Sequence, residues 1–328
     1  MIQYKLNVMG VLIISPRFYN YHNEIKHELE LRYDSVVLKS EVPFFSVGIY
    51  SKFVKRLCFI DSFLWYIYYK RLLRIIRKKS IDTIFVIRGY YLPCCLLDKL
   101  KTNFPAIKIL YYQWDSVQNN PNSLYISSRA DRSYTFDWED SVRYNDSFTY
   151  LPLYYHWSEE SLASKPILSD ILIVSSWSLY RSKILREIST KIKDYNFTLN
   201  IYMYLPPLSV LKHILLGRYG LVKGVNLFPI NKSRYLQMLR GCKAVLDIPS
   251  PTQSGASIRV IEALSMKKKI ITTNKTLSHV LFGADSPNIL EYDDFEQYQV
   301  FLDKPYEKTN DMPKVVLSLG EWLKIIGI

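Results

Sequence analysis

The stretch that decides the fold is residues 246–274, LDIPSPTQSGASIRVIEALSMKKKIITTN. It predicts a buried strand, a loop with proline, serine and glycine, an amphipathic helix and a second strand. Two charged side chains, Arg259 and Glu262, stand three residues apart among the apolar residues of the helix. This placement indicates that the N-terminal end of the helix requires one cation and one anion.

The chemistry of that helix end favours a nucleotide. We expect the helix to begin near Ala256, where unpaired N–H groups and the positive end of the helix dipole can bind phosphate. Gly255 lets a ligand approach the backbone closely. Arg259 suits bidentate phosphate binding, and Glu262 can accept two hydrogen bonds from a ribose diol. The alternative is an ion pair between Arg259 and Glu262 that serves the helix alone.

The rest of the chain repeats the alternation of strands and helices. In the first half, strands are predicted at 8–14, 35–39, 82–87, 107–112 and 148–153, and helices near 22–32, 61–79 and 93–102, with a short one after Asp137. A polar stretch at 156–170 follows, and the pattern then restarts with a strand at 171–176. This order predicts an α/β protein with two Rossmann-like, doubly wound domains facing each other, at 1–160 and at 161–328 with the terminal helix in the second.

Composition limits the class of protein and its location. The 328 residues carry 43 Lys and Arg against 30 Asp and Glu, a net charge of +13 that favours anionic partners or serves solubility alone. The four cysteines form no Cys-x-x-Cys pair, so neither disulfides nor zinc are expected, and a reducing cytoplasm is predicted. The N-terminus lacks the features of a signal peptide.

Residues 253–274 resemble the donor-binding segment of GT-B glycosyltransferases. The common form in that family is a Glu, a Gly, and a second Glu followed by Ala. Glu262 matches the second Glu and Gly255 the Gly, whereas Ser254 stands where the first Glu is expected, with Gln253 before it. The resemblance implies that Glu262 binds the ribose of the nucleotide. The missing first Glu leaves the donor sugar and the stereochemical outcome open.

The resemblance extends more weakly over most of the chain. Arg259, three residues before the second Glu, resembles a bacterial subset of lipopolysaccharide or capsule biosynthesis that includes proteins like the spore-coat maturation glycosyltransferases. Residues 171–188, ILIVSSWSLYRSKILREI, are similar to the first strand, loop and helix of the family's C-terminal domain. The resemblance nominates Ser175, Ser176 and Arg181 for the donor diphosphate. The first half resembles the acceptor domain, which makes GT-B the expected architecture.

Three further residues follow strands in the first half and are candidates for the chemistry. An inverting transferase needs a base for the acceptor hydroxyl, and Asp115 in YYQWDS and Asp137 in YTFDWED are the candidates. Either could instead cap a helix, which is the favoured alternative for Asp137. Arg88 in VIRGYY could contact an acceptor or a donor phosphate, or could simply be solvated.

The predicted function is metal-independent transfer of a hexosyl or related sugar. No Asp-x-Asp ends a strand, so no metal and no cofactor are expected beyond a nucleotide-sugar co-substrate. The expected acceptor is a cell-surface polysaccharide, such as capsule or O-antigen, or a lipid-linked sugar. The alternatives are a sugar-nucleotide epimerase of the same architecture and a non-catalytic nucleotide-sugar-binding protein. Nucleic acid is not an expected partner, because no binding motif for it occurs.

The basic segment at 52–79 is a candidate for binding to a membrane surface. It contains nine Lys or Arg and one acidic residue, Asp61, around an aromatic and aliphatic middle. Such a segment suits an anionic membrane surface. The alternative is a crossover helix of the first domain with its polar face in water. The apolar run is too short to span a bilayer. The prediction is a cytoplasmic protein, peripherally associated with the inner face of the bacterial inner membrane.

Overall fold

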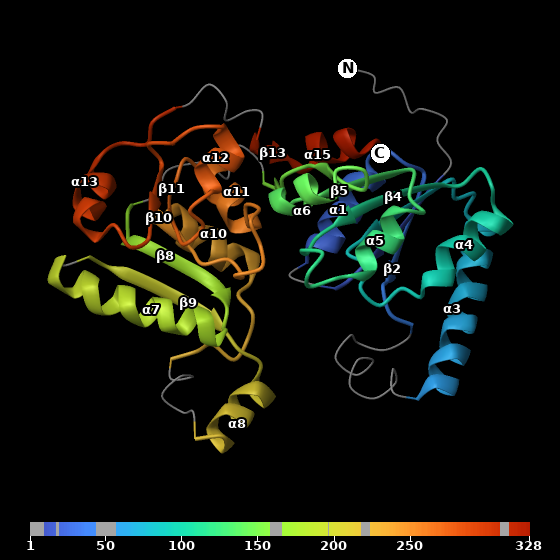
Figure 1. Cartoon of the computed structure of the whole chain (residues 1–328), viewed down its shortest axis with the longest axis horizontal. Coiled ribbons are helices and arrows are strands. Elements are labelled where there is room, and N and C mark those ends of the chain that lie inside the picture. Colours follow the sequence, from blue (N-terminus) through green and yellow to red (C-terminus); the bar gives the residue numbers. More distant parts are fainter. Residues whose placement is uncertain are drawn as a thin grey trace. The chain divides into compact units, whose positions relative to one another are not determined.

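The computed structural model divides the chain into two compact units (Figure 1). Unit 1 comprises residues 1–152 and 319–328, and unit 2 comprises residues 153–318. The structure describes residues 10–17, 20–43, 57–157, 166–195, 197–217, 224–308 and 315–328. One sheet of six strands and one of five account for most of the strands described, and every pairing between described strands is parallel. The predicted α/β class with two Rossmann-like domains is confirmed.

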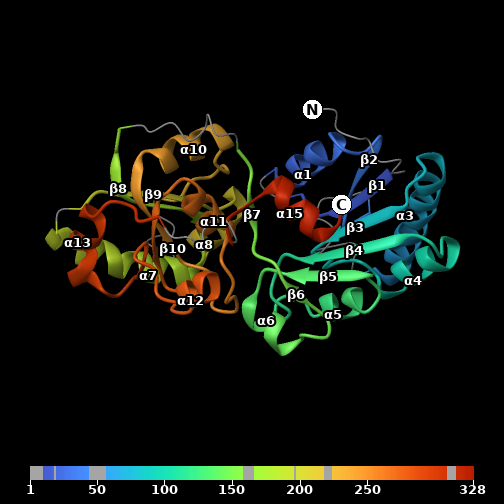
Figure 2. The same cartoon turned by 90° about the horizontal axis from the view of Figure 1, so that it is seen from above.

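Unit 1 is built on the six-stranded sheet, whose strands lie side by side in the order β2-β1-β3-β4-β5-β6 (Figure 2). The strands are β1 (Gly10–Ser15), β2 (Ser35–Ser40), β3 (Thr83–Ile87), β4 (Lys108–Gln113), β5 (Arg132–Thr135) and β6 (Thr149–Tyr150). The helices are α1 (Tyr21–Glu30), α3 (Cys58–Lys78), α4 (Cys94–Asn103), α5 (Asn122–Ser127), α6 (Trp138–Arg143) and α15 (Leu319–Ile326). Helix α5 and strand β5 lie outside the ranges that the sequence pattern predicted.

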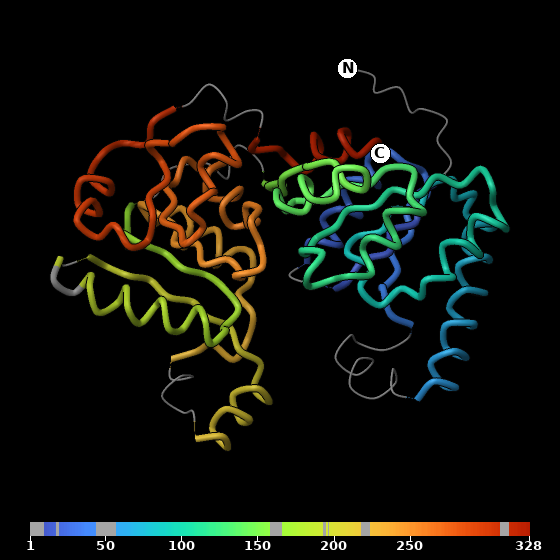
Figure 3. Tube along the Cα trace, viewed as in Figure 1, coloured from blue at the N-terminus to red at the C-terminus, as the bar shows by residue number. Residues whose placement is uncertain are grey.

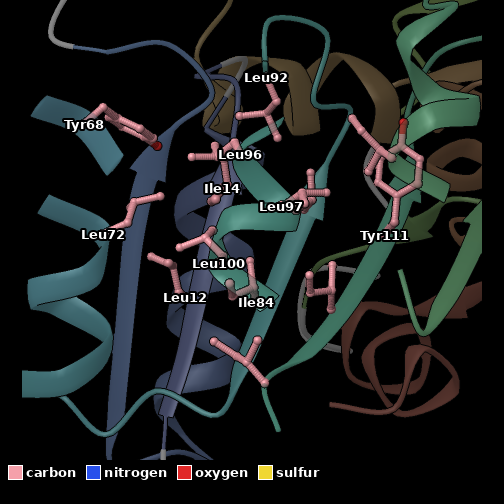
Figure 4. Close-up of a cluster of buried hydrophobic side chains, with 14 of the residues drawn as sticks. Leu12, Ile14, Tyr68, Leu72, Ile84, Leu92, Leu96, Leu97, Leu100 and Tyr111 are labelled. Atoms are coloured by element: carbon pink, nitrogen blue, oxygen red, sulfur yellow. The ribbon is translucent and has the colours of Figure 1, made fainter. Parts of the chain in front are cut away.

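The core of unit 1 forms where α3 and α4 cover one face of this sheet (Figure 4). Leu12 and Ile14 of β1 lie in one cluster with Leu72 of α3 and with Leu97 and Leu100 of α4. All five side chains are at most 1 % exposed. Burial of each such side chain contributes roughly 1.5–3 kcal/mol. Strands buried on both faces read as continuous apolar runs, which is why these strands were visible in the sequence.

The terminal helix α15 belongs to unit 1, which corrects its expected place in the C-terminal domain (Figure 3). Its Trp322 is fully buried, with its ring 6.0 Å from Phe85 and 4.6 Å from Tyr112 between centroids. The hydroxyl of Tyr134 donates to the carbonyl of Ile325 at 3.0 Å. The physical reason is that the second face of the sheet of unit 1 also has to be covered, and helical periodicity does not say which sheet a helix covers.

Unit 2 is built on the five-stranded sheet, in the order β12-β11-β10-β8-β9. Its strands are β8 (Ser169–Ser176), β9 (Leu199–Tyr204), β10 (Cys242–Asp247), β11 (Lys269–Thr272) and β12 (Ile289–Glu291). Its helices are α7 (Leu179–Lys191), η3 (Ile192–Tyr195), α8 (Pro207–Leu215), α10 (Lys232–Arg240), α11 (Ile258–Ser265), α12 (Leu277–Phe282), η4 (Phe295–Gln297) and α13 (Tyr298–Asp303). A small parallel pair joins β7 (Tyr154–Tyr155) to β13 (Leu317–Ser318).

The β7–β13 pair lies where the chain enters and leaves unit 2. The chain passes into unit 2 after residue 152 and leaves it after residue 318, and the pair ties these two crossings together. The boundary expected at residue 160 lies outside the described residues, as do residues 8–9 of the first predicted strand and residues 52–56 of the basic segment. No described helix is both long enough and apolar enough to cross a membrane.

Removal of the Trp322 side chain should destabilise unit 1. We expect Trp322→Ala to lower the free energy of unfolding by about 3–5 kcal/mol, because it leaves a large cavity between α15 and the sheet. Urea unfolding followed by circular dichroism measures the change. Trp138→Ala is the matched control. That ring is 41 % exposed, so its removal should lower the free energy of unfolding much less. Equal losses from the two substitutions would contradict the assigned role of α15.

Candidate nucleotide site in unit 2

The strand order of unit 2 contains a point at which the direction of winding changes. The chain runs from β8 outward to β9, then crosses back to β10 on the other side of β8. In open α/β sheets, ligands bind outside the carboxyl ends of the strands at such a point. The loops that follow β8 and β10 therefore flank the candidate site. The donor-binding residues predicted from the sequence lie at the end of β8, in the loop after β10, and on the helices α7 and α11 that follow these loops.

Arg181 joins these two loops. Its Nε donates to the carbonyl of Ile248 at 2.7 Å, and one terminal nitrogen donates to the carbonyl and hydroxyl oxygens of Ser176 at 3.2 and 3.1 Å. Ser178 caps α7 by accepting a hydrogen bond from the backbone N–H of Arg181 at 3.2 Å. The structure thus brings Ser176 and Arg181 to the loop after β10, and the guanidinium is fixed at the edge of the sheet.

Arg259 and Ser257 share one buried carboxylate, that of Asp247. Asp247 is the last residue of β10 and is 1 % exposed. The Ser257 hydroxyl donates to its Oδ1 at 2.7 Å, and a terminal nitrogen of Arg259 lies 3.6 Å from the same oxygen. A guanidinium has five N–H donors, so this contact leaves donors for an anionic ligand. Asp247 was not among the residues predicted from the sequence, although a carboxylate that ends an apolar strand is a recognisable signal.

Glu262 is held by a neighbour from another helix. It lies on α11, is 4 % exposed, and accepts a hydrogen bond from the hydroxyl of Tyr235 on α10 at 2.7 Å. A carboxylate has about four acceptor positions, so it can accept hydrogen bonds from several groups at once. Tyr235 is a second residue that the sequence did not reveal, since it lies 27 positions away. The contact orients Glu262, and its role with ribose stays a prediction.

The loop before α11 is pinned at several points. The carbonyl of Ser254 accepts a hydrogen bond from the Asn274 side chain at 2.8 Å, and the backbone N–H of Gln253 donates to the Ser250 carbonyl at 3.0 Å. Ser254 and Gly255 are buried. Helix α11 begins at Ile258, two residues later than expected. The loop is therefore part of the packed sheet edge, and Gln253 is half-buried in it.

The three candidates from the first half all lie in unit 1. Asp137 is 2 % exposed and accepts a hydrogen bond from the backbone N–H of Asp140 at 3.1 Å, so it caps α6 as the alternative reading proposed. Asp115 accepts from the backbone N–H of Ser116 at 3.0 Å and from the Asn119 side chain at 2.9 Å. Both carboxylates thus have local partners in their own loops.

Arg88 forms an ion pair with Glu41, which is fully buried and directly follows β2. Its Nε lies 3.4 Å from the same carboxylate, and the backbone N–H of Tyr90 also donates to it at 3.2 Å. Burial raises the pKa of Glu41, and the hydrogen bond from Arg88 opposes that shift. Arg88 has a positive φ of 65°. Arg88 therefore supports a buried charge, a partner that the sequence did not reveal.

No metal site is visible in the part of the chain that the structure describes. Across those residues, no group of three or more His, Cys, Asp or Glu side chains is placed so as to hold a metal ion. The charged groups at the carboxyl edge of unit 2 include Arg181, Arg259, Asp247 and Glu262. Two guanidinium groups beside two carboxylates can bind a ligand that carries both phosphate and hydroxyl groups.

No family model matches the chain, and no curated protein matches it. Several solved structures do match the chain. UDP-GlcNAc 2-epimerase from Methanocaldococcus jannaschii, in complex with UDP-GlcNAc and UDP, is 12 % identical over 97 % of this chain and 98 % of that one, with a TM-score of 0.56. The enzyme from Neisseria meningitidis bound to UDP-GlcNAc is 13 % identical over 97 % and 98 %, also with a TM-score of 0.56.

A glycosyltransferase is similar to the same extent. AviGT4, which is involved in avilamycin A biosynthesis, is 12 % identical over 97 % of this chain and 95 % of that one, with a TM-score of 0.55. At these identities the likeness shows the fold, which is the GT-B fold. The predicted function of sugar transfer to a surface or lipid-linked acceptor is corrected, because UDP-GlcNAc 2-epimerases predominate among the similar structures. Nothing in the comparison points to the lipopolysaccharide, capsule or spore-coat kind.

The carboxyl of Asp140, beside Asp137, should make stability depend on pH. Burial raises the pKa of Asp140 to about 6, and the Asp137 carboxylate adds to the shift. The carboxyl of an Asp in an unfolded chain has a pKa of about 3.9. The stabilising contribution is therefore complete below about pH 4 and is lost as the pH rises through about 6.

We expect the unfolding free energy of the wild type, relative to Asp140→Asn, to fall by about 2–3 kcal/mol from pH 4 to pH 7. The amide can still accept the bond that the backbone N–H of Val117 donates to Asp140 at 2.6 Å. Urea unfolding of both proteins at several pH values measures the difference. A constant difference across this range would contradict the raised pKa.

Proposed function

We propose that this protein is a sugar-nucleotide epimerase, which binds a nucleotide sugar in unit 2 and inverts one stereocentre of its sugar. The observation that carries the proposal is the buried carboxylate of Glu262, held by Tyr235 on the same sheet edge as Arg181 and Arg259. A ribose diol can donate to a carboxylate, and a diphosphate can accept from two guanidinium groups. A ligand with both groups is a nucleoside diphosphate or its sugar ester.

The comparisons support epimerisation over transfer to an acceptor. UDP-GlcNAc 2-epimerases with bound UDP-GlcNAc share the fold over nearly the whole chain. Epimerisation converts one substrate into one product and needs no acceptor. It requires that a C–H bond of the sugar breaks and re-forms on the opposite face, so a base must remove a proton and an acid must return one. The proposed reaction uses no metal and no resident cofactor.

Asp115 remains the proposed proton-transferring carboxylate of unit 1. It is half-buried, whereas Asp137 is almost fully buried and caps α6. Arg88 is engaged with Glu41 and has a structural role in this proposal. A cytoplasmic location also belongs to the proposal. It is supported by the four cysteines, which are all free thiols.

Substitution of Glu262 should weaken nucleotide binding. We expect Glu262→Ala to lower the affinity for UDP by about 1–3 kcal/mol, the scale for a polar partner left unpaired. Tyr235→Phe should have a smaller effect, since the carboxylate remains. Isothermal titration calorimetry measures both, with exposed Glu296→Ala as the charge-matched control. Equal affinity of wild type and Glu262→Ala would refute the ribose assignment.

Turnover should occur without an acceptor. We expect the protein to convert UDP-GlcNAc, or another nucleotide sugar, into an equilibrium mixture with its epimer in deuterated water. Deuterium should appear at the inverted carbon, because the proton that returns comes from an exchangeable group. Proton NMR of the sugar follows both changes. Binding without turnover would instead identify a non-catalytic nucleotide-sugar-binding protein, and turnover only in the presence of a glycan acceptor would reject epimerisation.

A further inference from the structure

Helix α3 of unit 1 divides its 21 residues between two faces. Its inner face packs on the sheet through Trp65, Tyr68, Leu72, Leu73 and Ile76, which are 0–8 % exposed. Figure 4 shows the side chains of Tyr68 and Leu72 on this helix, beside the first strands. The inner face alone accounts for the place of α3 as a crossover helix between β2 and β3.

The opposite face carries apolar side chains that the core does not use. Phe59 is 86 % exposed, Phe63 is 55 % exposed and Tyr66 is 56 % exposed. The next turns of the same face carry three exposed basic residues, Lys70, Arg74 and Arg77. Their spacings of three or four residues place all six on one line along the helix. We call these six residues the outer stripe, which is aromatic in its first half and basic in its second.

The charges of the outer stripe are not neutralised by carboxylates of the described chain. Among the salt bridges between described residues, none includes Lys70, Arg74 or Arg77. Lys70 instead lies 5.4 Å from the centroid of the Tyr66 ring. The exposed aromatic rings of this stripe are unfavourable in water, and its cations have no carboxylate partner among the described residues, so the stripe suits an amphipathic, anionic surface.

We propose that the outer stripe of α3 docks the protein peripherally on an anionic lipid bilayer. The aromatic half would enter the boundary between headgroups and acyl chains, and the basic half would contact lipid phosphates. Exposed aliphatic residues beside the aromatic half, Leu57 (53 %) and Ile60 (44 %), favour lipid over stacked nucleic-acid bases. The charge of the outer stripe argues against a second copy of this chain as the partner, because the basic halves of two stripes would repel each other. The proposal is independent of the epimerase activity.

Flotation of the full-length protein with vesicles tests the proposal. Vesicles of phosphatidylcholine alone are compared with vesicles that also contain phosphatidylglycerol, at low and at high salt. We expect binding only to the anionic vesicles, weakened by salt. Each basic residue near such a surface is worth about 1 kcal/mol, which is about fivefold in partitioning. The triple variant Lys70→Gln, Arg74→Gln, Arg77→Gln should therefore bind about 100-fold more weakly.

A second variant tests the aromatic half of the outer stripe. Phe59→Ser combined with Phe63→Ser should lower binding at equal charge and leave the melting temperature unchanged, because both rings are exposed. The matched control on helix α8 of unit 2 is Leu208→Ser with Leu215→Ser, whose side chains are 77 % and 78 % exposed. The control should bind as the wild type does. Loss of binding in the α8 variant alone would overturn the assignment to α3.

A charge-matched control completes the experiment. Lys183→Gln, Arg186→Gln and Lys191→Gln on helix α7 remove the same three charges from exposed positions of unit 2. This variant should retain vesicle binding. The proposal is overturned if the wild type fails to float at low salt, if the α7 control loses as much binding as the α3 variant, or if an oligonucleotide displaces the protein from the vesicles.

Discussion

A parallel sheet has to be covered on both faces, and this constraint organises unit 1. Helices α3 and α4 cover one face, and the last helix of the chain contributes the buried Trp322 to the other. The chain must therefore return from unit 2 to unit 1, and β7 pairs with β13 where the two crossings meet. The place of α15 in unit 1 follows from this requirement for burial.

The candidate site of unit 2 depends on a different balance, between cations and buried carboxylates. Arg181 binds backbone and hydroxyl oxygens, and Arg259 pairs with Asp247, so neither guanidinium has to be ordered when a ligand arrives. Glu262 is likewise oriented by Tyr235. Such pre-organisation reduces the entropy lost on binding. The same contacts tie the loops after β8 and β10 to the sheet, so the residues proposed for ligand recognition also stabilise this edge of unit 2.

Unit 1 shows how polar groups at a sheet edge can serve the fold. The fully buried Glu41 is matched by Arg88, and Asp137 caps a helix while raising the pKa of its neighbour Asp140. In the sequence, a charged residue that follows a strand looks the same whether it stabilises the fold or binds a ligand. The partners distinguish the roles, and those partners lie on other loops. Asp115 is half-buried and accepts hydrogen bonds from Ser116 and Asn119 in its own loop.

The sequence alone determined the α/β class, most strands and helices, and the loop and helix at 246–274, because buried parallel strands and amphipathic helices leave local patterns. It also selected Arg181, Arg259 and Glu262, which the structure places on one sheet edge. The tertiary structure alone decided that α15 covers unit 1. It also supplied the partners Tyr235, Asp247 and Glu41, which pair across the chain. Such pairings leave no local pattern, because they depend on which surfaces meet once the sheets have formed.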